Sequence, residues 1–188
     1  MSDLQRNICG KYQIDIFHDQ NFKQGSADNL HQYDFEYFDA NDFVFPTIYG
    51  VKIYEGKNLL KSAVIGSIGG GTSIYKNSTI LEDDRLLICC SDSIFCLSVP
   101  DLELHWRTKA DWATCFEIFK FQDSYIVHGE LEISRLAKDG KLIWQHSGAD
   151  IFVTNDGSEA IELTADFILA TDWENQKYKF DYDGNDIT

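Results

Sequence analysis

The chain has 188 residues, a formal net charge of −15 and 44% hydrophobic residues, which is enough for one domain with its own core. The negative charge argues against binding to nucleic acid or to anionic membranes, because both require clustered Lys and Arg. The chain starts with polar residues and has no apolar stretch behind them, so the sequence predicts a cytoplasmic protein without a signal peptide or a membrane span.

The cysteine and histidine content predicts neither a metal nor a cofactor. An odd number of cysteines without an export signal indicates free thiols. Neither a Cys-x-x-Cys motif nor a pair of histidines at metal-binding spacing occurs. Four cysteines sit in apolar, strand-like segments, where free cysteine behaves as a small hydrophobic residue. The five are Cys9, Cys89, Cys90, Cys96 and Cys115.

The first 48 residues form an atypical N-terminal part of a single domain that covers residues 1–188. They contain one clear strand pattern, Lys11–Phe17, followed by an acidic and aromatic stretch. Helix is expected only in short turns and at most over Phe22–His31. This segment supplies either strands that the first repeat lacks or a cap on its edge.

Residues 49–188 contain a repeat with a period of about 38 to 44 residues. Its clearest copy is Leu136–Trp144, and related copies are Ser98–Trp106, Phe180–Ile187 and, more weakly, Val51–Leu60. Each reads as a short strand, a turn and a second strand. In the clearest copy the turn is Asp139-Gly140, which supplies the positive φ that a tight hairpin needs.

The middle repeat predicts four strands, Ala113–Phe119, Tyr125–His128, Leu131–Leu136 and Lys141–Gln145. Apolar and polar residues alternate along the third of them, as in a half-buried strand. The predicted fold is therefore all-β, a small or partial β-propeller-like array of about four antiparallel four-stranded units. A twisted β-sandwich and an open array with a capped edge are alternatives.

The repeat resembles the blades of quinoprotein-like and WD40-like β-propellers. Leu136, Gly140, Lys141 and Trp144 match their pattern of an aliphatic residue, a turn and Gly-Lys-x-x-Trp, whereas the copy ending at Trp106 matches it only in part. The resemblance implies architecture only, because propellers host many functions. It also implies that Trp106 and Trp144 pack between blades.

Three segments only partly fit known motifs. The glycine-rich Gly66–Ser73 has Thr72 where a phosphate loop needs Lys, so it reads as a connection between blades. Asp181–Asp186 has its glycine too early for a calcium loop and reads as a hairpin turn. His128-Gly-Glu130 lacks the cysteine partner of a zinc deaminase. None of them predicts an enzyme active site.

Acidic residues gather in two stretches without Lys or Arg, Gln24–Val51 and Leu142–Gln176, and aromatic residues lie among them. Such a mixture suits a surface that binds a basic protein. The alternative is a solvated acidic face whose aromatic rings point inward. The candidate partner-binding residues are Asp34, Glu36, Asp39, Asp42, Asp172, Trp173 and Glu174.

Two classes of function remain open. The first is a non-enzymatic protein that binds a basic protein partner, because a small, acidic, single-domain protein is similar in profile to bacterial immunity proteins, which neutralise toxins. The second is a β-propeller enzyme or ligand-binding domain whose site lies at a central channel. The sequence favours the first, with a basic toxin domain as one form of the partner.

Overall fold

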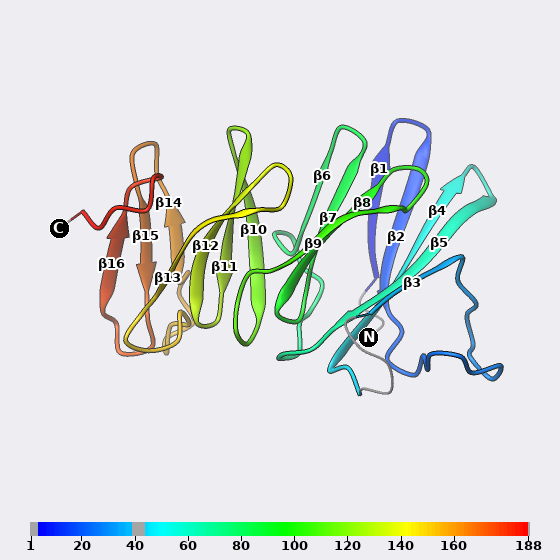
Figure 1. The fold of residues 1–188 in the computed structure, drawn as a ribbon, viewed down its shortest axis with the longest axis horizontal. Coiled ribbons are helices and arrows are strands. Elements are labelled where there is room, and N and C mark those ends of the chain that lie inside the picture. The colour runs from blue at the N-terminus through cyan, green and yellow to red at the C-terminus, as the bar shows by residue number, and fades with distance from the viewer. Residues whose placement is uncertain (1–3, 39–43, 188) are drawn as a thin grey trace.

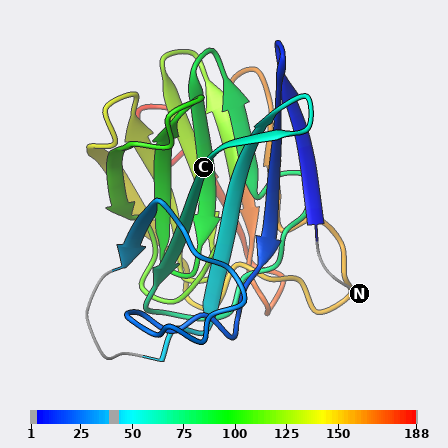
Figure 2. The ribbon, with the colours of Figure 1, turned by 90° about the vertical axis from the view of Figure 1, so that its right-hand side faces the viewer.

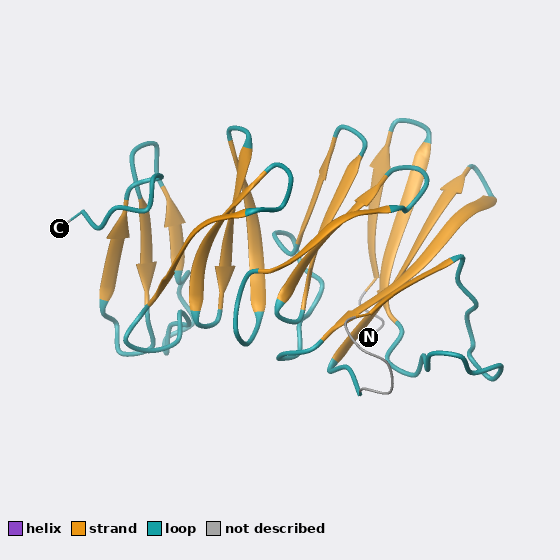
Figure 3. Ribbon diagram, in the orientation of Figure 1, coloured by secondary structure: helices purple, strands orange, loops and turns teal. Residues whose placement is uncertain are grey.

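A computed structural model describes residues 4–38 and 44–187, and every regular element in them is a β-strand (Figure 3). The strands form four sheets that stand side by side in chain order (Figure 1). The first and fourth sheets lie at opposite ends of the row (Figure 1). The predicted all-β, propeller-like array is confirmed, and its described part is an open row of sheets.

The first sheet combines strands of the N-terminal segment with strands of the first repeat. Its order is β1-β2-β4-β5-β3, and β3 pairs with β5 in parallel. The N-terminal segment thus supplies strands to the first unit. Helix was expected at most over Phe22–His31, and this segment forms turns and bends instead. The strands are β1 (Leu4–Cys9), β2 (Tyr12–His18), β3 (Phe35–Phe38), β4 (Thr47–Glu55) and β5 (Asn58–Ser67).

The second and third sheets are regular four-stranded antiparallel meanders. The four strands predicted for the middle repeat are all present, shifted by one or two residues. The second sheet consists of β6 (Thr79–Glu82), β7 (Arg85–Cys90), β8 (Ser93–Ser98) and β9 (Leu104–Lys109). The third sheet, which is the middle repeat, consists of β10 (Cys115–Phe121), β11 (Ser124–Gly129), β12 (Glu132–Ala137) and β13 (Leu142–Ser147).

The fourth sheet has three strands, one fewer than predicted, namely β14 (Ile161–Leu163), β15 (Ile168–Thr171) and β16 (Lys177–Phe180). Beyond β16 the chain turns back and forms only a single bridge, between Phe180 and Asp186. The outward-facing side of this last sheet is largely polar and includes Glu162 and Lys177. Such a face suits the last repeat of an array, which has no following repeat to pack against.

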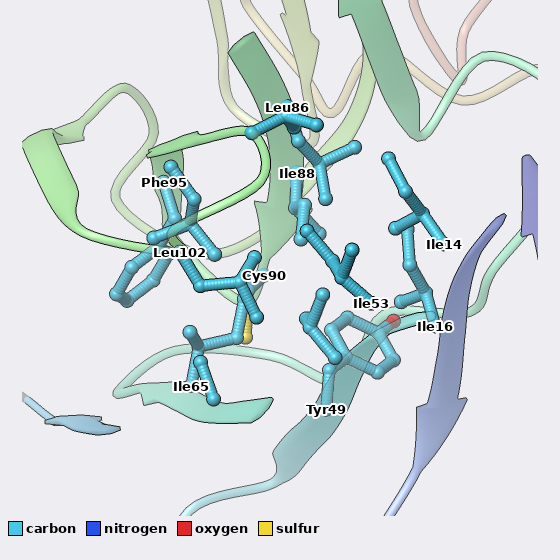
Figure 4. Close-up of a cluster of buried hydrophobic side chains, with 14 residues drawn as sticks. Ile14, Ile16, Tyr49, Ile53, Ile65, Leu86, Ile88, Cys90, Phe95 and Leu102 are labelled. Carbon is cyan, nitrogen blue, oxygen red and sulfur yellow. The ribbon is translucent and has the colours of Figure 1, made fainter. Parts of the chain in front are cut away.

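Apolar side chains fill the spaces between neighbouring sheets. β7 sends Leu86 and Ile88 toward the first sheet (Figure 4) and Leu87 and Cys89 toward the third. Most positions of β8, β11 and β12 are buried for the same reason. The expectation of a half-buried third strand in the middle repeat is therefore wrong, because a stacked sheet is covered on both faces. Figure 2, seen along the row, shows the sheets behind one another.

A tryptophan on the last strand of one sheet packs on a glycine turn of the next sheet. Gly140 has φ +83°, and a Cβ built on it would lie 2.6 Å from Cε3 of Trp106. Gly184 has φ +87°, and its Cβ would lie 2.7 Å from Cγ of Trp144. The same contact thus joins the second sheet to the third and the third to the fourth. The expected packing of Trp106 and Trp144 between units is present.

Candidate functional site: the connection end

All segments that connect one sheet to the next lie along the same long edge of the row, at one end of the strands (Figure 1). We call this the connection end and define it by residues 68–78, 91–92, 110–114, 130–131, 148–160 and 172–176. The glycine-rich Gly66–Ser73 falls here, where it leads from β5 to β6. Hairpin turns at residues 83–84, 99–103, 122–123, 138–141, 164–167 and 181–185 form the opposite end, which we call the turn end.

Asp111 fixes the connection end between the second and third sheets. It is 1% exposed, and its carboxylate accepts four backbone hydrogen bonds. Oδ1 accepts from the N–H groups of Ala113 at 2.5 Å and Thr114 at 2.9 Å, and Oδ2 accepts from those of Leu131 at 2.9 Å and Glu132 at 2.8 Å. Burial raises the pKa of Asp111, and these hydrogen bonds oppose that rise. One side chain thus ties the connection before β10 to the turn between β11 and β12.

Asp92 has a similar role one sheet earlier. It is 1% exposed, and its Oδ1 accepts hydrogen bonds from the hydroxyls of Ser67 at 2.7 Å and Ser93 at 2.8 Å. Its Oδ2 lies 3.1 Å from Nζ of Lys109. The same ammonium group lies 4.6 Å from the ring centroid of Trp112. A cation therefore sits between a buried carboxylate and an exposed indole ring.

Two tryptophans project from this rigid frame into solvent. Trp112 is 67% exposed and Trp173 is 42% exposed, although tryptophan is usually well covered in a monomer. Leu131 is 37% exposed and lies on the turn between them. Exposed aromatic side chains on loops are typical of protein-binding surfaces.

Several carboxylates lie on the loops of the same end. Asp150, Asp156, Glu159 and Glu174 are exposed and Glu130 is half-buried on the loops of the third and fourth sheets. The chain has no Lys or Arg from Leu142 to Gln176, so these loops give the connection end a negative potential.

The second predicted stretch contributes two of its three candidates to this surface. Trp173 and Glu174 are exposed on the turn between β15 and β16. Asp172 is 0% exposed. Its Oδ1 accepts a hydrogen bond from the N–H of Gln176 at 2.9 Å, and its Oδ2 accepts one from the hydroxyl of Tyr178 at 2.8 Å. Asp172 is therefore withdrawn from the predicted surface, because it shapes the turn that presents Trp173.

The first predicted stretch lies on the first sheet, at the far end of the row (Figure 1). Asp34 anchors the start of β3, because its carboxylate accepts hydrogen bonds from the N–H of Ser62 at 2.8 Å and from its hydroxyl at 2.9 Å. Glu36 is exposed on β3. Asp39 and Asp42 lie outside the described residues. Among the described candidates, Asp34 and Glu36 thus lie on a different sheet from Trp173 and Glu174.

The described aromatic side chains of the first stretch point inward. Phe45 is buried and Tyr33 and Phe38 are partly buried in a cluster against the outer face of the first sheet. Phe35 and Tyr37 pack on the core between the first two sheets. For these rings, the alternative of an acidic face with inward-pointing aromatics is the arrangement found.

A pocket of about 390 Å³ lies between the third and fourth sheets, on the side where a propeller would have its channel. Glu117 Oε2 lies 2.8 Å from His128 Nδ1, and Oε1 accepts a hydrogen bond from Asn77 at 3.0 Å. His128 Nε2 lies 2.8 Å from the carbonyl oxygen of Phe152. Burial alone would raise the pKa of Glu117, but the bonds to His128 and Asn77 outweigh it and lower that pKa. These groups have their hydrogen-bond partners within the protein, and they link the connections at residues 68–78 and 148–160 to strands β10 and β11.

Two absences hold for the residues that the structure describes. No cluster of three or more His, Cys, Asp or Glu side chains in them is arranged to hold a metal ion. Residues 4–38 and 44–187 also contain no helix with the length and apolar character needed to cross a bilayer.

Solved structures show where this architecture is shared. The computationally designed Ika8 protein aligns with a TM-score of 0.52 at 7% identity over 98% of this chain. BamB from Moraxella catarrhalis, a β-propeller-like protein, aligns with a TM-score of 0.50 at 14% identity over 99%. This chain covers 60% of the length of each. The likeness shows the fold alone.

No protein-family description and no curated protein sequence matches the chain.

Proposed function

We propose that this protein is a non-enzymatic binding protein whose connection end holds a basic protein partner in the cytoplasm. The observation that carries the proposal is the pair of exposed tryptophans, Trp112 and Trp173, set among exposed carboxylates on loops that buried aspartates hold in place. In protein interfaces, aromatic side chains often supply most of the binding energy. The charged residues around them favour a partner of opposite charge.

An immunity-type inhibitor of a basic toxin domain is the form of this role that the sequence profile favours. Such an inhibitor must meet its target quickly. A strongly negative surface accelerates encounter with a positive one, and the net charge of −15 supplies that field.

The alternative of a ligand site at a central channel has less support. The described sheets form an open row, and the acidic and imidazole groups at the channel-side pocket are paired with each other and with the backbone.

Reversing two acids of the connection end should slow association with the partner. The change is Glu159→Lys with Glu174→Lys, at exposed positions of residues 148–160 and 172–176. At low salt we expect the association rate constant to fall about tenfold or more. The difference should fade toward 1 M NaCl, where the Debye length is about 3 Å.

The experiment first isolates the partner from the native host with the wild-type protein, identifies it, and then measures the rates with both proteins purified. The matched control reverses the same charge at the turn end, by Asp123→Lys with Asp166→Lys, which are also exposed. An acidic partner, or an equal loss of rate in the control, would contradict the proposal.

A further inference from the structure

A buried histidine on the third sheet has an oxygen acceptor opposite each of its two ring nitrogens. His128 lies on β11 and is 5% exposed. Its Nδ1 lies 2.8 Å from Oε2 of Glu117, and its Nε2 lies 2.8 Å from the carbonyl oxygen of Phe152. A neutral imidazole carries only one N–H and donates to only one of these oxygens. The arrangement therefore needs a second proton.

The second proton belongs on the imidazole. Among the described residues that line the adjoining pocket, none is a Lys or Arg that would donate to Glu117 in its place. Burial alone would raise the pKa of Glu117, but the bonds to His128 and Asn77 outweigh it and lower that pKa. The carboxyl group is therefore ionised near neutral pH, and the pair consists of a carboxylate and an imidazolium.

The other titratable groups around the pair are acids or buried neutral groups. Burial raises the pKa of Tyr75, Cys89 and Cys115, so these three keep their protons. None of the rest is a cation that would compete with the imidazolium for Glu117. Those on the neighbouring loops and on the fourth sheet are Asp111, Glu130, Glu159, Asp172 and Tyr178.

The pair ties a loop of the connection end to the third sheet. Phe152 lies in residues 148–160, where His128 holds its carbonyl and its N–H donates to the carbonyl of Glu130 at 2.7 Å. One residue earlier, the carbonyl of Ile151 accepts a hydrogen bond from the N–H of Trp173 at 2.9 Å. A movement of the loop at Phe152 therefore reaches the turn that presents Trp173.

Loss of the second proton breaks one of the two bonds to the imidazole. The remaining N–H serves either Glu117 or Phe152. If it serves Glu117, the buried carbonyl of Phe152 has no donor. If it serves Phe152, Nδ1 of His128 and a carboxylate oxygen face each other as two acceptors at 2.8 Å, a distance that suits only a donor and an acceptor.

We infer that Glu117 and His128 form a proton-operated latch, which holds residues 148–160 against the third sheet and loosens as the pH rises. An ordinary imidazole has a pKa of about 6.5, so above that pH the folded chain holds one proton more here than the unfolded chain. Stabilisation by the latch is then lost as the pH rises. The latch works in the free protein, so it stands whether or not the connection end binds a partner.

The variant Glu117→Gln tests the latch most sharply, because its network is complete without the second proton. The new carboxamide donates to Nδ1 of a neutral His128, whose Nε2–H serves Phe152, and its oxygen still accepts from Asn77. Amide hydrogen exchange of the full chain is followed at Phe152 and Trp173 from pH 6 to 9, relative to the intrinsic rate at each pH. We expect protection to fall about tenfold or more in the wild type, and less than about twofold in the variant.

Glu132→Gln is the matched control. Glu132 is also a buried acid on the third sheet, but its Oε1 accepts from the hydroxyl of Ser147 at 2.9 Å. This variant should keep the pH dependence of the wild type. Melting temperatures at pH 6 verify that both variants are folded.

Nitrogen-15 NMR of the His128 ring gives a second readout that does not depend on the stability of a variant. At pH 6 both ring nitrogens should carry protons in the wild type, and only one should in Glu117→Gln. A singly protonated ring in the wild type at pH 6, protection that is independent of pH, or an equal loss of protection in wild type and Glu117→Gln would overturn the inference.

Discussion

Replacing Gly140 by valine should lower the free energy of unfolding by about 3 kcal/mol. Gly140 has φ +83°, where a β-branched residue is strained, and its new side chain would also meet the Trp106 ring, with the Cβ 2.8 Å from Cγ. The melting temperature should fall by about 6–12 °C in thermal unfolding followed by circular dichroism.

Gly56→Val separates the two causes. Gly56 also has a positive φ, +60°, but no atom lies within 4 Å of its added Cβ. It should therefore cost only the backbone strain, about 1–2 kcal/mol. If the two variants melted at the same temperature, the packing of Trp106 on Gly140 would not contribute to stability and our account of how the second and third sheets join would be wrong.

Asp111→Ala should destabilise the protein by about 3–4 kcal/mol, because it leaves four backbone N–H groups without their acceptor in a buried place. Chemical denaturation measures the loss. Amide hydrogen exchange should also quicken at residues 113–114 and 131–132, since these donors lose their bonds first.

Asp150 provides the matched control. It follows Ala149 as Asp111 follows Ala110, yet it is exposed, and its Oδ1 accepts a local hydrogen bond from the N–H of Ile151 at 2.7 Å. Asp150→Ala should cost less than about 1 kcal/mol. Similar losses in the two variants would mean that Asp111 does not clamp the connection end.

The sequence predicted the hairpins well, because their chemistry is local. Asp-Gly favours a tight turn through its own backbone preferences, so Asp139-Gly140 predicted a hairpin directly. The regular spacing of similar turns along the chain then predicted the hairpins of the other sheets. Trp106 and Trp144 were placed between units for the same reason. The pattern of the last repeat, however, did not predict that its fourth strand shrinks to a single bridge at Asp186.

Pairings distant in the sequence could not be predicted. β3 joins β5 in parallel across more than twenty residues, and no local pattern specifies such a partner. Asp172 shows the same limit at the level of one side chain. In the sequence it stands among exposed polar residues, whereas its burial depends on Tyr178, which the β15–β16 turn brings back to it.

The candidate surface was predicted only in part. Trp173 and Glu174 lie on it, but Asp34 and Glu36 of the first stretch belong to another sheet. Trp112 was missed as a binding residue, although one signal was available. It follows Asp111 as Trp173 follows Asp172, and both pairs place a buried aspartate beneath an exposed indole ring.

Amide hydrogen exchange of the protein with and without its purified partner tests the central claim most directly. Binding should slow exchange at residues 110–114, 130–131 and 172–176 of the connection end, and should leave the turn end, including residues 122–123 and 164–167, unchanged. Protection confined to the turn end or to β3, with the loops of Trp112 and Trp173 exchanging as in the free protein, would contradict the account.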